Sequence, residues 1–188
     1  MSQPDVYYPK SYDITYRIGY VVGFMGILIF VFSYIFNSLN YILLGLAIFE
    51  AGTLLSGTFL LVWRKEVKIF ILSCIIMGII LSAVSFYFFN FNALFKEISI
   101  IVSIGFVLAG LGGLYGKEAY CFHFYEGWIL LWSFPILILL NLIVFISNYQ
   151  SNPAVHLIFS IIYFFIMLLA LSFLIKKIKQ PLMQYCQN

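Results

Sequence analysis

Six apolar runs separated by short polar breaks dominate the sequence. They cover about residues 18–36, 39–63, 67–89, 98–115, 127–147 and 154–175. The length of each run matches the about 17–25 residues that a helix needs to cross the hydrocarbon core of a membrane. The pattern therefore predicts an all-α integral membrane protein with six transmembrane helices.

These runs divide the chain into three parts. A polar N-terminal segment (1–17) precedes a single transmembrane domain (18–175), and a basic tail (176–188) follows it. The longest break between apolar runs, residues 116–126, combines glycine, charged and aromatic residues. We expect this break to form a loop at the inner surface of the membrane.

The basic residues predict the orientation of the chain. With the N-terminus on the cytoplasmic or stromal side, all ten lysines and arginines except Lys96 fall on inner segments. Lysine and arginine concentrate in the cytoplasmic loops of membrane proteins. The distribution therefore places both termini on the cytoplasmic or stromal side and also supports an even number of spans.

Composition limits the classes of function. The chain is 64% hydrophobic and 9% charged, whereas a soluble domain is about 25% charged. Lipid is therefore the expected outer solvent. The net charge of +3 gives no reason to expect a nucleic-acid partner.

Two spacing patterns predict how helices meet the membrane and each other. Tyr12, Tyr16 and Tyr20 recur every four residues, so we expect one helix face of tyrosines anchored at headgroup depth. Gly105 and Ala109 begin a second four-residue pattern that continues at Gly113. Small residues at this spacing let helix backbones approach closely in a membrane.

Glu50 is the first candidate for chemistry, because it lies near the middle of the second apolar run. A charged carboxylate there costs about 2.5–3.5 kcal/mol on insertion scales. Ser82, Ser103 and Asn141 lie at comparable depth in other runs, and we expect them to join Glu50 in a polar cluster. The cluster is either a proton or cation site or a set of hydrogen bonds between helices.

The second candidate is the expected inner loop, which reads GKEAYCFHFYEG from Gly116 to Gly127. Its polar side chains are Lys117, Glu118, Cys121, His123 and Glu126. Thiolate, imidazole and carboxylate groups are common metal ligands. The spacing does not supply a second cysteine or histidine nearby to complete a tetrahedral site, so we predict no metal and no cofactor.

The three cysteines are Cys74, Cys121 and Cys186. All three fall toward the inner side in the predicted orientation. Thiols stay reduced in the cytosol, so we expect no structural disulfide.

The stretch GKEAYCFHFYEGW, residues 116–128, resembles a segment of a family of uncharacterised integral membrane proteins from cyanobacteria and plastids. The resemblance rests on Lys117-Glu118 followed by Cys121-Phe122, with similar apolar spans over most of the chain. It implies a multi-spanning protein of a bacterial plasma, thylakoid or plastid membrane, and it implies no activity.

Catalytic and phosphate-binding motifs are absent from the sequence, with no Gly-rich phosphate loop, HExxH, GxSxG or CxxC. This favours a non-catalytic accessory or assembly component of a larger membrane complex, with a homo-oligomer as a further arrangement. A small transporter or channel built around Glu50 is an alternative. A membrane enzyme or cofactor binder that uses the Cys121/His123 loop is a third hypothesis.

Overall fold

All regular structure in the described part of the chain is helical. The computed structural model describes residues 9–60, 65–88, 93–149 and 152–182. Its helices are α1 (Lys10–Ile35), α2 (Leu39–Thr58), α3 (Lys65–Phe88), α4 (Ala93–Phe122), α5 (Tyr125–Ile146) and α6 (Pro153–Lys179). Each of these six helices is long and apolar enough to cross a membrane. The predicted fold class, an all-α membrane protein with six spans, is confirmed.

Three helices extend well beyond the apolar runs that predicted them. α1 begins at Lys10, α4 continues to Phe122, and α6 continues to Lys179. The prediction of an inner loop at 116–126 is therefore wrong for the first seven residues, which form the last turns of α4. His123 adopts a left-handed backbone conformation with φ of 55° at the short turn between α4 and α5. Charged side chains within these added turns form ion pairs, such as Asp13 with Arg17 and Glu118 with Lys177.

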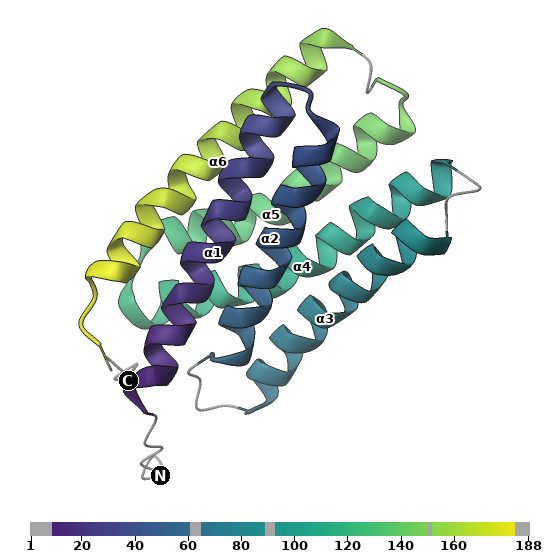
Figure 1. Ribbon diagram of the computed structural model, residues 1–188. Helices are drawn as coiled ribbons and strands as arrows, with labels where there is room; N and C mark the ends of the chain where they lie inside the picture. Colours follow the sequence, from purple (N-terminus) through teal and green to yellow (C-terminus); the bar gives the residue numbers. More distant parts are fainter. Residues whose placement is uncertain (1–8, 61–64, 89–92, 150–151, 183–188) are drawn as a thin grey trace.

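The contacts between helices arrange five of them in a ring, and α3 lies at the outside of the bundle (Figure 1). Around the ring, α1 contacts α2 and α6, α4 contacts α2 and α5, and α5 contacts α6. α3 packs against α4 and α2. The centre of the ring holds a cavity of about 120 Å³ with an almost entirely apolar lining.

Glycines bring α1 and α2 into the closest approach of the bundle. A Cβ atom on Gly52 would overlap the backbone of Gly23, and a Cβ atom on Gly26 would overlap the backbone of Phe49. Gly19 and Gly23 have the four-residue spacing of close helix packing, a signal that sequence analysis missed. In α4, where small residues recur every four positions, Gly113 faces Ile71 of α3.

The start of α1 and the end of α6 lie at the same end of the bundle (Figure 1). In the predicted orientation this is the inner end of the protein. The last residues of α4 and the first residues of α5 lie there as well.

Candidate functional site

Glu118 is a completely buried carboxylate at the inner end of the bundle. Its Oε1 atom accepts hydrogen bonds from Tyr16 Oη at 2.7 Å and Lys117 Nζ at 2.8 Å. Its Oε2 atom accepts one from Lys177 Nζ at 2.6 Å. One carboxylate thus connects α1, α4 and α6, and both of its oxygen atoms have partners.

The two lysines are held from several sides. Lys177, whose side chain is 4% exposed, also donates to the side chain of Gln180 at 2.9 Å. Both ammonium groups lie over the same two aromatic rings, those of Tyr16 and Phe122, at 5.0–5.6 Å from the ring centroids. Such cation–π contacts add to the ion pairs. Tyr16, Lys117, Glu118, Lys177 and Gln180 are called the inner charge cluster.

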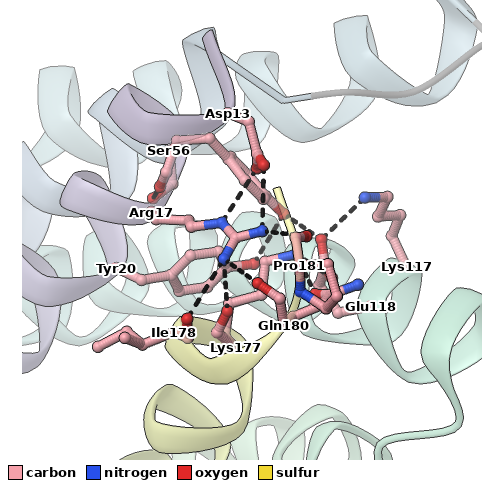
Figure 2. Close-up of polar contacts among 11 residues, drawn as sticks. Asp13, Arg17, Tyr20, Ser56, Lys117, Glu118, Lys177, Ile178, Gln180 and Pro181 are labelled. Atoms are coloured by element: carbon pink, nitrogen blue, oxygen red, sulfur yellow. Dashed lines mark hydrogen bonds and ion pairs between the residues drawn. The ribbon is translucent and has the colours of Figure 1, made fainter. Parts of the chain in front are cut away.

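Arg17 attaches the end of α6 to α1 (Figure 2). Its Nη1 atom donates to the carbonyl oxygens of Lys177 at 3.1 Å and Gln180 at 2.6 Å, and Nη2 donates to Pro181 at 2.8 Å. The last carbonyl groups of a helix lack partners within the helix and attract a cation. Asp13 completes the arrangement, because it forms a two-point ion pair with the same guanidinium.

The tyrosines of α1 share one face, as the four-residue spacing predicts, but this face points into the bundle. Tyr16 is fully buried, and its hydroxyl lies 3.0 Å from that of Tyr20, which is also buried. The prediction of a headgroup anchor is therefore wrong for these two residues. Tyr12 has an exposed side chain. A buried Tyr hydroxyl needs a polar partner, and Glu118 supplies it.

The electrostatic balance favours a cluster that holds helices together. Removing a carboxylate and an ammonium from water costs several kcal/mol per ion, and this cost is offset only when pairing and hydrogen bonding are nearly complete. Glu118 meets that condition with three donors. Glu118 is also completely buried, so a substrate could not reach its oxygen atoms without a rearrangement of the cluster.

The remaining residues predicted for the inner loop do not join this cluster. Glu126 of α5 pairs with Lys176 of α6 at 2.5 Å and accepts a hydrogen bond from Ser172 at 3.0 Å. His123 is exposed. Lys117 and Glu118 are thus the two predicted residues that meet, and no group of three or more potential metal ligands occurs within the described residues.

Cys121, the last of these residues, is disulfide-bonded. The prediction of no disulfide is therefore wrong, and the thiolate that would ligate a metal or act as a nucleophile is absent in this state. Cys74 is a free cysteine. Cys186 lies outside the described residues.

The predicted intramembrane polar cluster divides into two places. Glu50 of α2, Ser82 of α3 and Ser103 of α4 line one small cavity of about 50 Å³, and Ser82 is a hydrogen-bond partner of Glu50. Asn141 of α5 lies apart from them. It donates to the carbonyl of Leu137, accepts a hydrogen bond from Tyr163 at 3.0 Å, and lines the central cavity.

Three residues of the inner charge cluster have other predicted roles. The sequence places Tyr16 at the membrane interface, and it places Lys177 and Gln180 in the basic tail. Helical spacing contains a signal for Lys177, because Ala170, Phe173 and Leu174 precede it by seven, four and three residues and all are buried. A lysine on the buried face of an apolar helix indicates a polar partner inside the protein.

One comparison with known proteins gives a match. A family model described as "Uncharacterized integral membrane protein (DUF2301)" matches residues 57–184, which is more than half of the chain and includes Lys117, Glu118 and Lys177. No curated protein and no solved structure matches the chain.

Proposed function

The chain belongs to the DUF2301 family of uncharacterised integral membrane proteins, and we propose that it is a non-catalytic accessory or assembly component of a larger membrane complex. The complex binds it through a lipid-facing groove between α4 and α5. The resemblance of residues 116–128 to cyanobacterial and plastid proteins supports a bacterial plasma, thylakoid or plastid membrane as its location.

The groove is the observation that supports this proposal. It has a volume of about 480 Å³, and its lining includes Gly105, Ala109 and Gly112 of α4 and Pro135 of α5. Ala109 is exposed. α5 is also the least buried of the six spans, with large apolar side chains on its surface that include Trp132, Ile136, Leu139 and Ile143.

Physical chemistry in lipid favours a helix as the occupant. Lipid tails are as apolar as leucine, so helices associate in membranes through close packing against small residues. The glycines of α1 and α2 already pack against each other within the chain. Ala109 instead leaves space at the lipid-facing surface, which suits a bulky side chain from a transmembrane helix of a partner.

The test compares Ala109→Leu with Ala83→Leu. Both alanines are exposed within spans, so the two variants make the same change on α4 and on α3. Membranes are extracted in mild detergent, and the band containing this chain is analysed by native electrophoresis and mass spectrometry. We expect the wild-type chain and Ala83→Leu to migrate in a large complex and Ala109→Leu to be released from it.

Two outcomes would count against the proposal. If the wild-type chain migrates alone, the accessory or assembly role is wrong. If Ala109→Leu stays in the complex as Ala83→Leu does, the groove is not where the partner binds.

The shared cavity of Glu50, Ser82 and Ser103 favours transport of protons or cations as a second candidate. Intramembrane carboxylates are enriched at such sites. In vesicles containing the purified protein, this hypothesis predicts a proton or cation flux that Glu50→Gln abolishes. Glu66→Gln, a change of an exposed carboxylate at the start of α3, should leave the flux intact. An absence of flux in the wild-type protein would end this hypothesis.

A further inference from the structure

The inner charge cluster carries more positive than negative charge. Lys117 and Lys177 both bond to Glu118, so two ammonium groups share one carboxylate. The adjacent pair of Arg17 and Asp13 is neutral by itself, and Lys176 pairs with Glu126. The described residues thus leave one positive charge in excess at a site that is largely removed from water. Such an excess is costly and attracts an anion.

Lys117 is the part of the cluster that an anion can reach. Its side chain is 14% exposed, whereas those of Lys177 and Glu118 are 4% and 0% exposed. An ammonium group has three N–H donors. Among the described residues, Lys177 uses two of them, for Glu118 and Gln180, whereas Lys117 uses one, for Glu118. Toward the described part of the chain, Lys117 therefore has two further donors on the more exposed side of the cluster.

The depth of Lys117 fits the phosphate of a lipid. α4 has 30 residues, which span about 45 Å at 1.5 Å per residue. This matches the about 40–45 Å of a bilayer that includes its headgroup layers. Lys117 precedes the end of α4 by five residues and so lies about 7.5 Å below the inner end of the helix. The headgroup layer meets the hydrocarbon core at this level.

We propose that the inner charge cluster binds a phosphate group, supplied by an anionic phospholipid of the inner leaflet. Lys117 donates charge-assisted hydrogen bonds to the phosphate oxygens, and Lys177 supplies the second positive charge from the buried side of the cluster. The bound phosphate balances the cluster at the point where α1, α4 and α6 meet. Basic pockets between transmembrane helices bind anionic headgroups by the same chemistry. This site is independent of the groove between α4 and α5.

The experiment measures lipid binding by the purified full-length protein. Native mass spectrometry counts retained lipid molecules, and thermal unfolding is followed in micelles with added phosphatidylglycerol, phosphatidylcholine or inorganic phosphate. We expect phosphatidylglycerol to be retained and to raise the unfolding temperature, and phosphatidylcholine to have little effect. A rise with inorganic phosphate equal to that with phosphatidylglycerol would instead identify a free phosphate ion as the ligand of the same site.

Variants separate a specific site from general attraction to a charged surface. Lys117→Gln should weaken phosphatidylglycerol binding about 30-fold. Lys179→Gln removes the same charge from an exposed position at the end of α6 and should weaken it about fivefold or less. Lys117→Arg keeps the charge and should bind within about fivefold of the wild type.

Unfolding in phosphatidylcholine alone shows whether each variant is folded. If Lys117→Gln does not fold, the wild-type response to the three additives and the binding by Lys117→Arg still decide the question. Equal losses in Lys117→Gln and Lys179→Gln, or no difference between the two lipids for the wild type, would overturn the proposal.

Discussion

Glu118→Gln tests whether the inner charge cluster holds the bundle together. The substitution keeps the size of the side chain and an oxygen that can accept from Tyr16, but it removes the negative charge between Lys117 and Lys177. Lys177 is 4% exposed, so its ammonium group cannot turn to water in the folded state. Breaking a buried pair from one side costs about 3–5 kcal/mol. The folding equilibrium should therefore shift by more than about 100-fold.

A double substitution separates the charge from the packing. Lys177→Met keeps an unbranched side chain of similar length and leaves Glu118 paired with Lys117. In the double variant Glu118→Gln/Lys177→Met, no unpaired ammonium remains in the buried position. We expect it to recover at least about 2 kcal/mol relative to the sum of the two single variants, which is the signature of direct coupling.

The assay is reversible unfolding in mixed micelles, followed by the fluorescence of the tryptophans. Glu126→Gln is the matched control, because Glu126 also pairs with a lysine of α6, and that lysine is 47% exposed. Its cost should stay below about 1 kcal/mol. The reasoning would be refuted if Glu118→Gln cost no more than Glu126→Gln, or if the losses of the two single variants were simply additive.

Two further predictions concern packing and capping. Gly52→Ala should lower the free energy of unfolding by about 1–3 kcal/mol, because its Cβ atom would overlap the backbone of Gly23 and overpacking carries this cost. Gly105→Ala is the control, because its Cβ atom would lie 3.7 Å from Ile138, and it should change thermal unfolding little. Equal losses of stability in the two variants would contradict the close packing of α1 and α2. Arg17→Gln should cost about 1.5–3 kcal/mol and speed amide hydrogen exchange in the last turn of α6, and unchanged exchange there would show that Arg17 does not hold that turn.

The number of spans was predictable because the membrane restricts the choices. A backbone in lipid must satisfy its own hydrogen bonds, so each sufficiently long apolar run forms a helix. The same reasoning located the ends of several helices poorly. The apolar pattern identifies the part of a helix that crosses the hydrocarbon. It does not identify additional turns whose charged residues pair with another helix. The last turns of α4, with Lys117 and Glu118, are such a case.

Helical periodicity and depth predicted part of the intramembrane polar set. Glu50 has Ser82 and Ser103 around one cavity, as their shared depth suggested. Asn141 has a similar depth but belongs to α5, and α5 contacts neither α2 nor α3 among the described residues. The depth of a residue in the membrane follows from its position in an apolar run. Which helices are neighbours depends on packing, so the sequence alone could not predict that Asn141 bonds to Tyr163 rather than joining Glu50.

The inner charge cluster combines two features that each have an ordinary interpretation alone. A tyrosine near the start of a span is usually an interfacial anchor, and lysines after the last span are usually attracted to lipid headgroups. In this protein Tyr16 and Lys177 instead meet at a carboxylate from a third helix. The pattern that distinguishes the two cases is helical phase, because a polar residue in phase with buried apolar residues must find a polar partner inside the protein. Lys177 has this phase, and Lys179 is exposed. The same criterion explains why Glu118→Gln is expected to destabilise the bundle strongly, whereas loss of the Lys179 charge is not.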